Sequence, residues 1–579
     1  MQHRRPAPSD HAGAVPKPTL AGFEKWERER EKIRMRNHSQ QRRTFRRDHH
    51  RGTMAVAAAI AILAAACAPS APTDSGSPTP QPAPATPSAP DAPSEITIVT
   101  AEDPPTLEAP YGYSATTGVV LRNIQEPLVG RDRASGAFVP LLATSWENVD
   151  DVTWRFTIRD GVTFHDGSPL NAEAVAFALN ISWSEEYVSG PLLGFKGPDF
   201  EVVPVSDMAV EVRLEAPDPI LPNRLWMSPI FSQQHFETQG EDKWREEPIG
   251  TGPYRFVEWV RGQSITIELN EDWWGHSDPA AADGTATIQR ATYLIRSDQQ
   301  SRIAAVRAGE AQLAERLPAD QCLTDLGDGC LVAPNIDIAH IRIDTMGTLL
   351  SDVRIREAMA LAIDRESIGV ALLPGPPARM LVPTGAVGFN EDIPLVPFDP
   401  DRARELVQAA AADGVPVNRT INFRIEREKF PGISEVAQAI QAMWTDVGLT
   451  IDFEILDSAI FLEQVVGPPR PISPDREWVI LHQHSNRLAD FAGTVTAWYR
   501  CEARISTYCN EEFDEIVGRA LVATGTDRQS LLAQAAALAH SEYPFIPVIE
   551  MGVFHGLGPN LVWEPRADTN VYLKNMSLR

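Results

Sequence analysis

Apolar and polar side chains alternate most clearly on either side of a turn at Asp160-Gly161. The apolar positions are Trp154, Phe156 and Ile158 before the turn, and Val162 and Phe164 after it. This period of two predicts a strand, a turn and a second strand. Residues 96–100 form a short β-branched run, which is typical of a buried strand.

Helical signals follow the strand signals along the chain. Asn171 and Asp352 each stand where a helix N-cap belongs, directly before a stretch with apolar residues at helical spacing. Asp399-Pro400 gives a third start with proline at the first helical position, and Gly414 gives a stop. Strands and helices mix without a fixed repeat, so the pattern predicts α/β or α+β lobes. A chain of 579 residues is too long for one simple core and should form at least two lobes.

The charge of the chain is uneven. The formal charge is −26, and since residues 1–51 contribute +8, the remainder carries −34. A strongly acidic body repels phosphates, which argues against nucleic acid as a partner. The acidity is compatible with a cationic ligand, but the need to keep the protein soluble also explains it.

The N-terminal part has the layout of an export signal. Residues 55–66 are the long apolar run, and as a helix these twelve residues span about 18 Å, too short to cross a membrane. Basic residues precede the run and small residues follow it, as in a signal peptide. Arg42-Arg43 also resembles the twin-arginine export motif, although a generic basic region explains it equally well. Residues 1–54 are expected to be a basic segment, with Met35 as an alternative start.

Cys67 directly follows the apolar run. Residues 55–67 therefore resemble the signal peptide and lipobox of a bacterial lipoprotein, in which the cysteine is acylated. Leu63 lies one position further from the cysteine than in the usual lipobox, and the alternative is ordinary cleavage nearby. Residues 68–95 are rich in Pro, Ala and Ser, which predicts a disordered tether to the folded part.

The folded part contains four cysteines, which form two neighbouring pairs. They are Cys322 and Cys330, then Cys501 and Cys509. An exported chain meets oxidising conditions, which favour disulfides. Four cysteines can pair in three ways, and pairing each cysteine with its neighbour closes the shortest loops. A zinc site is the alternative, but the short spacing that zinc ligands usually have is absent. We therefore expect two structural disulfides and no metal.

Several motifs resemble, in the correct order, those of the family 5 extracellular solute-binding proteins, the oligopeptide-, dipeptide- and nickel-binding receptors of ABC importers. The motifs are 105–108 (PTLE), 123–129 (NIQEPLV), 140–146 (PLLATSW), 156–170 (FTIRDGVTFHDGSPL), 248–256 (PIGTGPYRF), 353–365 (VRIREAMALAIDR) and 508–514 (YCNEEFD). The glycines of residues 250–252 could be mistaken for a phosphate loop. Without a following Lys-Ser/Thr, a close backbone approach is the better interpretation.

The resemblance implies an α/β, two-lobed, periplasmic-binding-protein-like fold (type II, cluster C) with an extra subdomain in the first lobe. Closure of two such lobes buries a solute and forms a shape that a permease recognises. The implied limits are 96–305 for the first lobe with an insertion at about 114–220, 306–545 for the second lobe, and 546–579 for a C-terminal return to the first.

The resemblance also implies where a ligand binds. Peptide-binding relatives hold the ligand's α-amino group with an aspartate in a motif like Ala489-Asp490-Phe491, and a buried carboxylate–ammonium pair is a strong hydrogen bond. The alternative is that Asp490 caps a helix or pairs within its own lobe. The further candidates for ligand contact are Arg487, His484, Trp498, Phe491, Glu102, Asp103 and Tyr113.

These candidates have alternatives of their own. His482, His484 and Arg487 contact a ligand carboxylate or else line a solvated face, and Trp498 is a stacking wall or part of the core. Glu102 and Asp103 fall where relatives contact the ligand backbone.

The expected function is therefore an extracytoplasmic, lipid-anchored, monomeric receptor for a peptide or peptide-like solute, which delivers it to ABC permease subunits and uses no cofactor. The alternatives are a receptor for a glycan, a siderophore or a metal complex. An exported hydrolase is disfavoured, since no G-x-S-x-G or H-E-x-x-H motif is present.

Overall fold

The computed structural model describes residues 94–579, apart from 113, 134–135, 188–196, 280–281, 428, 462, 464–476, 497, 504–505 and 567. The predicted basic segment, signal peptide, Cys67 and nearly all of the tether lie outside the described residues, as does Tyr113.

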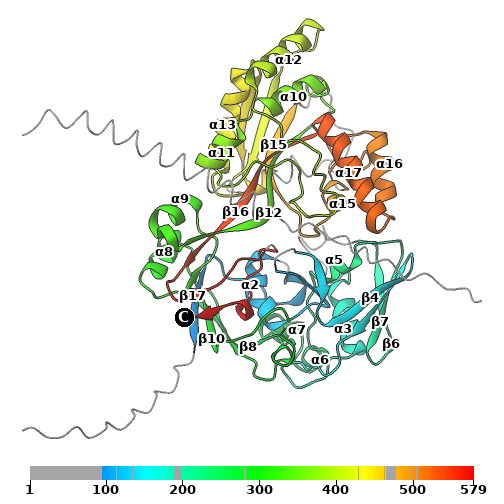
Figure 1. Ribbon diagram of the computed structural model, residues 1–579, viewed down its shortest axis with the longest axis vertical. Coiled ribbons are helices and arrows are strands. Elements are labelled where there is room, and N and C mark those ends of the chain that lie inside the picture. The colour runs from blue at the N-terminus through cyan, green and yellow to red at the C-terminus, as the bar shows by residue number, and fades with distance from the viewer. Residues whose placement is uncertain are drawn as a thin grey trace, which may run out of the picture. The chain divides into compact units, whose positions relative to one another are not determined.

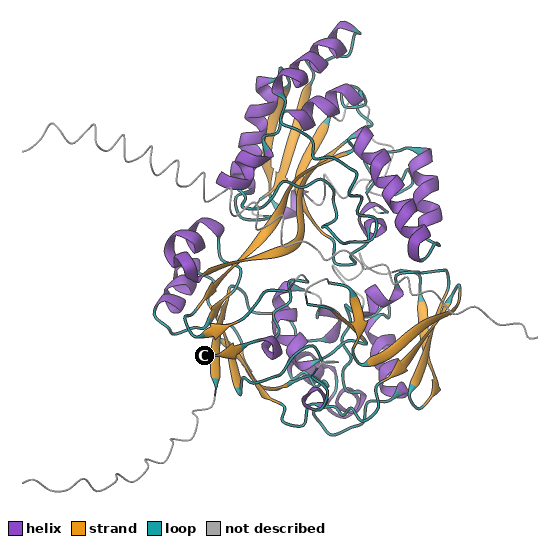
Figure 2. Cartoon of the chain, viewed as in Figure 1, coloured by secondary structure: helices purple, strands orange, loops and turns teal. Residues whose placement is uncertain are grey.

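A ten-stranded mixed sheet runs through the protein (Figures 1 and 2). Its strands, in spatial order, are β14 (Thr450–Leu456), β13 (Thr420–Glu426), β15 (Trp478–Ser485), β12 (Cys330–Ile343), β16 (Phe545–Leu557), β11 (Leu313–Ala314), β1 (Glu95–Thr100), β10 (Arg290–Ile295), β9 (Ser264–Leu269) and β8 (Tyr254–Val260). The predicted strand at 96–100 is confirmed as β1. It pairs in parallel with both β10 and β11.

The long strands β12 and β16 form the centre of this sheet. They pair antiparallel from Cys330 opposite Gly556 to Arg342 opposite Phe545, with a register shift between Pro334 and Ile338. Figure 1 shows them passing from the side of α8 and α9 to the side of α10 to α17. Two lobes therefore share one sheet, and the strands between them are continuous.

The second lobe has a core on each face of its strands. Helices cover the first of these cores: α10 (Val353–Leu361), α11 (Arg365–Ala371), α12 (Pro400–Ala412) and α13 (Ile433–Asp446). Asp352 and Asp399 accept hydrogen bonds from backbone N–H groups at the starts of α10 and α12, so both predicted N-caps are confirmed. Gly414 takes a positive φ just after α12, as a helix stop requires.

The other core of the second lobe lies around the last helices. These are α15 (Phe491–Val495), α16 (Glu511–Ala520) and α17 (Gly525–Glu542), preceded by the short α14 (Ser458–Phe461). The predicted disulfide between Cys501 and Cys509 is formed before α16, with Cα atoms 4.3 Å apart.

The first lobe joins both ends of the described chain. Strand β1 and helix α2 (Ala115–Ile124) share a core with residues 561–576, near β17 (Leu561–Val562), η6 (Leu573–Asn575) and β18 (Ser577–Leu578). A Cβ on Gly250 would lie 2.3 Å from the carbonyl oxygen of Ile124, so no side chain fits there. The structural interpretation of the glycines at 250–252 is confirmed. The exact limits predicted for the lobes stay a prediction.

A four-stranded antiparallel sheet forms the other part of the first lobe. Its order is β4 (Ala143–Asp150), β5 (Thr153–Ile158), β7 (Ala209–Leu214) and β6 (Phe200–Ser206). The remaining elements there are β2 (Val129–Arg131), β3 (Phe138–Pro140), α3 (Ala172–Ser182), α5 (Leu221–Leu225), α6 (Gln233–Gln239) and α7 (Glu241–Glu246). Trp154, Phe156 and Ile158 are buried on one face of β5, and Asn171 caps α3, as predicted.

The second strand predicted at Val162 and Phe164 is wrong. Both side chains are buried, but the backbone folds back on itself through hydrogen bonds from Leu170 N–H to the Val162 oxygen and from Phe164 N–H to the Ser168 oxygen. The true partners of β5 come from further away, β4 before it and β7 about fifty residues after it.

Short elements complete the described chain: η1 (Ala109–Tyr111), η2 (Trp274–His276), α8 (Gln299–Arg307), α9 (Ala319–Gln321), η3 (Cys322–Leu326) and η4 (Gly327–Gly329). The second predicted disulfide joins Cys322 to Cys330, with Cα atoms 5.3 Å apart. Within the described ranges, none of the helices has the length and apolarity needed to span a membrane.

Candidate functional site

The candidate site lies on the strands β12 and β15 of the second lobe. Their register places His340 opposite His482 and Ile338 opposite His484. Because side chains alternate along a strand, the three histidines share one face. The opposite face carries apolar residues such as Ile341 and Leu481, which are part of the core beneath α10 to α13.

Aromatic rings from two other segments close over these histidines. Trp498, after α15, stacks on His340 with ring centroids 5.6 Å apart and meets the edge of His484 at 5.2 Å. Phe461, at the end of α14, stacks on His482 at 5.9 Å with an interplanar angle of 11°. We call these five residues the histidine–aromatic cluster. The structure thus brings together His484 and Trp498, two predicted site residues.

Hydrogen bonding holds the ring of His484 in place. The Thr494 hydroxyl lies 2.8 Å from His484 Nε2 and accepts a hydrogen bond from Asn486 Nδ2, also at 2.8 Å. The Nε2 atom of His484 is therefore engaged within the protein. Burial lowers the pKa of His484 to about 4, so the ring is neutral at pH 7.

The other two histidines are neutral for the same reason. Burial lowers the pKa of His482 to about 3, and the cations Lys429 and Arg342 reinforce this effect. His340 is fully buried, and burial holds its pKa well below the usual value. The cluster therefore presents neutral aromatic rings and not positive charge. No group of three or more His, Cys, Asp or Glu side chains among the described residues is arranged to hold a metal ion.

Positive charge lies beside the cluster. The guanidinium of Arg342, two residues along β12 from His340, is 5.5 Å from the ring centroid of Trp498 and 5.7 Å from that of Trp478. Arg342 was not predicted as a site residue. Arg487, which was predicted, is partly buried in the loop after β15, and its ligand role stays a prediction.

Asp490 has partners inside its own lobe. Its carboxylate is fully buried and accepts hydrogen bonds from Arg528 Nε at 2.8 Å and Arg528 Nη2 at 2.9 Å. It also caps α15 by accepting from Ala492 N–H at 2.8 Å. This is the structural alternative stated for Asp490. The role of ligand anchor stays a prediction, and this geometry disfavours it because both oxygens are engaged.

The loop that carries Asp490 is held rigidly. Asn486 accepts from the Asp490 N–H at 2.9 Å and donates to its carbonyl oxygen at 3.0 Å. Ala489 has a φ of +51°, an uncommon conformation for a residue with a Cβ. Val387 N–H donates to the Ala489 oxygen, which ties the loop to a neighbouring segment.

The same loop contacts the first lobe. Leu488 is buried in the core of the four-stranded sheet of that lobe, and its carbonyl oxygen accepts a hydrogen bond from Asn223 Nδ2 at 2.7 Å. Residues 485–490 therefore connect the histidine–aromatic cluster to the opposite lobe. Nothing in the sequence around Leu488 signals this contact.

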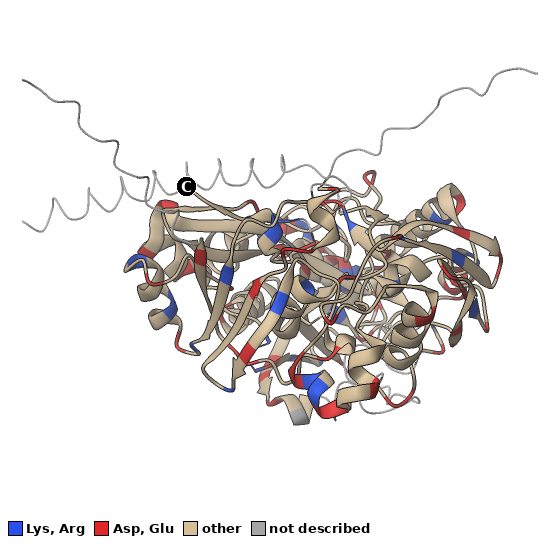
Figure 3. Cartoon of the chain, turned by 90° about the horizontal axis from the view of Figure 1, so that it is seen from below, with Lys and Arg blue, Asp and Glu red and all other residues tan. Residues whose placement is uncertain are grey.

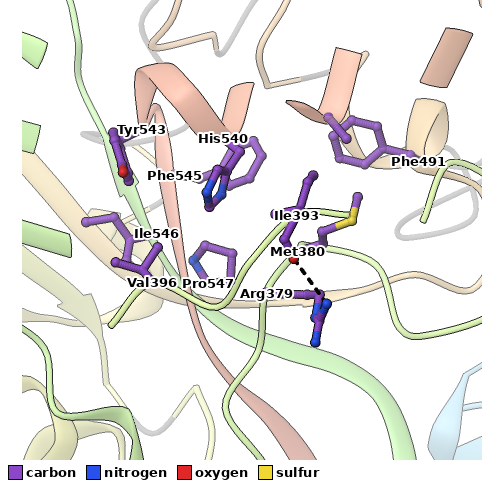
Figure 4. A pocket seen from close by; sticks show the side chains of 11 residues that line it. Arg379, Met380, Ile393, Val396, Phe491, His540, Tyr543, Phe545, Ile546 and Pro547 are labelled. Carbon is purple, nitrogen blue, oxygen red and sulfur yellow. Dashed lines mark hydrogen bonds between the residues drawn. The ribbon is translucent and has the colours of Figure 1, made fainter. Parts of the chain in front are cut away.

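Phe491 points into the second lobe. It is fully buried and lines a small internal cavity with Met380, Ile393 and Phe545 (Figure 4). Arg379 borders this cavity and donates to the Ile393 carbonyl oxygen at 3.1 Å. The expectation that Phe491 contacts a ligand is not supported by this position, since its ring packs among core residues.

The predicted residues of the first lobe lie apart from the cluster. Asp103 accepts from Trp259 Nε1 and from Gly262 N–H, both at 2.8 Å, and so fixes the turn between β8 and β9. Asp103 thus has a structural role, and its expected contact with ligand backbone stays a prediction. Glu102 is exposed and accepts from the Thr116 hydroxyl at 3.3 Å; its ligand role stays a prediction.

Comparison with known proteins identifies the family to which this chain is similar. Residues 137–480, more than half of the chain, match the family described as bacterial extracellular solute-binding proteins, family 5 Middle. Heme-binding protein A of Haemophilus influenzae is 24% identical over 495 residues, which cover 79% of this chain and 88% of that protein. The dipeptide-binding protein of Escherichia coli is 23% identical over 460 residues, covering 72% and 81% of the two chains.

A solved structure agrees in fold. The ABC transporter-associated periplasmic binding protein DppA from Helicobacter pylori, in complex with peptide STSA, has a TM-score of 0.63 at 18% sequence identity, covering 84% of this chain and 98% of that one. Members of the matching family are two-lobed, extracytoplasmic and bind solutes without catalysis. The chain belongs to the family 5 bacterial extracellular solute-binding proteins.

Proposed function

We propose that this protein captures a peptide or peptide-like solute between its two lobes and delivers it to the permease of an ABC importer. The observation that carries the proposal is the continuous pair β12–β16, which lets two lobes move about a shared sheet. The contact of Leu488 with the first lobe, next to the histidine–aromatic cluster, supports the same interpretation because it joins the candidate ligand surface to the lobe that would close on it.

The chemistry of the cluster fits part of a peptide. Neutral rings offer stacking surfaces for apolar side chains, and Arg342 offers a positive charge for a carboxylate or a carbonyl oxygen. The relative named above for dipeptide binding, and the neighbour solved with a bound peptide, make peptides the first class to test.

A planar metal complex is the second candidate. It is favoured by the same cluster, in which His340 stacks on Trp498 and His482 stacks on Phe461, and by the relative named for heme binding. The imidazole Nε2 of His484 is already hydrogen-bonded, so such a ligand would bind chiefly by stacking.

Isothermal calorimetry with two panels separates these candidates. Synthetic di-, tri- and pentapeptides form one panel, and haemin and a nickel–histidine complex form the other. Micromolar or tighter binding of a peptide supports the first proposal, whereas binding of haemin alone would replace it with the second. The Arg342→Gln variant should weaken peptide binding about tenfold by removing a charged hydrogen bond.

We also propose that Cys67 is acylated after export and anchors the protein, as a monomer, to the outer face of the cell membrane. The apolar run followed by small residues and a cysteine supports this, and residues 68–95 then serve as the tether. Incorporation of labelled palmitate that is lost in Cys67→Ser tests the anchor. Labelling of the variant equal to the wild type would contradict it.

The lobe limits are part of the same proposal: 96–305 with the insertion at about 114–220, 306–545, and the return at 546–579. The core that joins β1, α2 and residues 561–576 supports the return. Limited proteolysis should cut at the exposed residues 308–310, which follow α8 at the first limit, before it cuts at 545–546, which lies inside the buried strand β16.

A further inference from the structure

The first lobe contains a cavity that is lined by several cationic side chains and is separate from the cavity beside Phe491. Its walls come from the end of α2, the β2–β3 hairpin, Pro253 and Asp283, and the C-terminal return. The cationic lining residues are Arg122, Arg131, Arg566 and Lys574. Acidic and basic positions are interspersed over the elements seen in Figure 3, and the chain as a whole is acidic, so four cations around one small cavity stand out.

The carboxyl groups around this cavity do not balance the cations. Arg566 takes two of them, since it pairs with Asp568 at 2.8 Å and also contacts Asp283. The third, Glu126, accepts hydrogen bonds from Thr251 at 2.9 Å and Trp274 at 2.8 Å. Burial raises the pKa of Glu126, which further reduces its value as a counter-charge.

Three cations therefore lack a carboxylate at ion-pair distance, although Glu126 attracts Lys574 and Asp568 attracts Arg131 from further away. Within the part of the chain that the structure describes, Arg122, Arg131 and Lys574 form no ion pair. Lys574 donates to the Ala282 carbonyl oxygen, and Arg122 donates to the Gly112 oxygen at 2.9 Å. Arg122 also lies near the Tyr572 hydroxyl, but its Nη1 has no hydrogen-bond partner among the described residues.

Arg131 is the least satisfied of the three. It is only 5% exposed, and its guanidinium makes no hydrogen bond to any described residue. It lies 4.7 Å from the ring centroid of Phe138 and 4.9 Å from that of Trp226. Cation–π contacts are weak compared with the cost of burying an unpaired ion, so the two rings do not offset the burial of this charge.

The space beside Arg131 can be reached from outside and is small. Two of its lining residues contact solvent, since the side chain of Asp283 is 34% exposed and Pro140 is exposed. The cavity has room for a few water-sized groups, which suits an ion of few atoms and excludes a peptide. Guanidinium groups match oxyanions best because their planar donors pair with two oxygens at once.

We propose that this cavity of the first lobe binds a small oxyanion, of the phosphate, sulfate or carboxylate class, held by Arg131 and Arg122 with Lys574. The bound ion would fix the C-terminal return to α2 and the β2–β3 hairpin, because its ligands come from all three segments. This site is separate from the solute site proposed above, since its described lining residues all belong to the first lobe and the C-terminal return.

Titration of the full chain with simple salts tests the proposal. Inorganic phosphate, sulfate and acetate are compared with chloride at equal ionic strength, by thermal unfolding and by calorimetry. At least one oxyanion should raise the unfolding temperature in a saturable way that chloride does not reproduce. The anion that acts most strongly identifies the source: phosphate or sulfate an inorganic ion, acetate a carboxylate.

Two variants locate the effect. Arg131→Gln should weaken oxyanion binding at least tenfold, from loss of a charge-assisted hydrogen bond. Arg290→Gln is the matched control, since Arg290 is a half-exposed arginine on β10 of the same lobe, and it should bind as the wild type does. Stabilisation by chloride equal to that by the oxyanions, or unchanged affinity in Arg131→Gln, would overturn the proposal. If that variant does not fold, absence of calorimetric oxyanion binding by the wild type at millimolar concentration would overturn it equally.

Discussion

Replacing Asp490 with asparagine separates its two assigned roles. Asparagine is as good an N-cap as aspartate, so the cap on α15 is kept and only the negative charge is removed. The charge that remains belongs to Arg528, whose side chain is 5% exposed. Leaving a buried ion without its partner typically costs about 3–5 kcal/mol. This is a large share of the roughly 5–15 kcal/mol by which a domain is stable.

The magnitude follows from the geometry of the pair. Two hydrogen bonds of 2.8 and 2.9 Å join Arg528 to the two oxygens of Asp490, and both groups are shielded from water. Arg528→Met should be destabilising to a similar degree, because it leaves the carboxylate buried alone. The double variant should lose less than the sum of the two single losses, since neither charge is then stranded.

Urea denaturation and peptide calorimetry on the same samples provide the assay. The control is Asp272→Asn, which breaks a pair with Arg255 at 3.3 Å in which the aspartate is 84% exposed, and it should cost under about 1 kcal/mol. If Asp490→Asn keeps the stability of the wild type but loses tenfold or more in peptide affinity, Asp490 is a ligand anchor and the structural interpretation is refuted.

Three further perturbations have definite expected results. His484→Gln should flatten the pH dependence of stability. The unfolded histidine takes up a proton near its ordinary pKa of 6.5, whereas the folded ring has a pKa of about 4 and stays neutral. In urea denaturation, the free energy of unfolding of the wild type should therefore fall by about 1.5 kcal/mol more than that of the variant between pH 6.5 and 5.0. Equal falls in the two proteins would contradict this. Glu477→Gln should cost about 2–3 kcal/mol by the same method, because the buried carboxylate accepts from the backbone N–H groups of residues 348–350; a change under 0.5 kcal/mol would contradict this. The double variant Cys501→Ser, Cys509→Ser should lose about 2.5 kcal/mol of unfolding free energy, because the disulfide no longer restricts a short loop in the unfolded chain. Equal unfolding temperatures of the oxidised and reduced wild type would contradict this.

Features that depend on neighbouring residues were predictable from the sequence. The N-caps at Asn171, Asp352 and Asp399 each act within one helical turn, so a single polar side chain before an apolar stretch is enough to indicate them. The two disulfides belong to the same class, because each closes a short loop.

Features that depend on distant pairing were not predictable. His340 joins His482 only through the register of β12 and β15, which are separated by about 140 residues. Arg528 reaches Asp490 from another helix, so the sequence showed a suitable carboxylate but not its partner. The second strand expected at Val162 failed for the same reason, since alternation identifies a buried face and not the strand that covers it.

The family resemblance identified the fold and class of function, but less of the site. His484 and Trp498 do lie together, whereas Asp103 and Phe491 have structural surroundings. A motif that places an aspartate near the right loop does not determine which way its carboxylate points. That depends on side chains packed against it from other parts of the chain.

Mass spectrometry of the small molecules released from the purified full chain tests the central claim most directly. The account predicts one peptide-sized molecule per protein, which rebinds after removal and is recovered intact after prolonged incubation. Recovery of a cleaved or otherwise altered molecule would make the protein an enzyme. Absence of any peptide, together with no calorimetric response to the peptide panel, would remove peptides as its ligands.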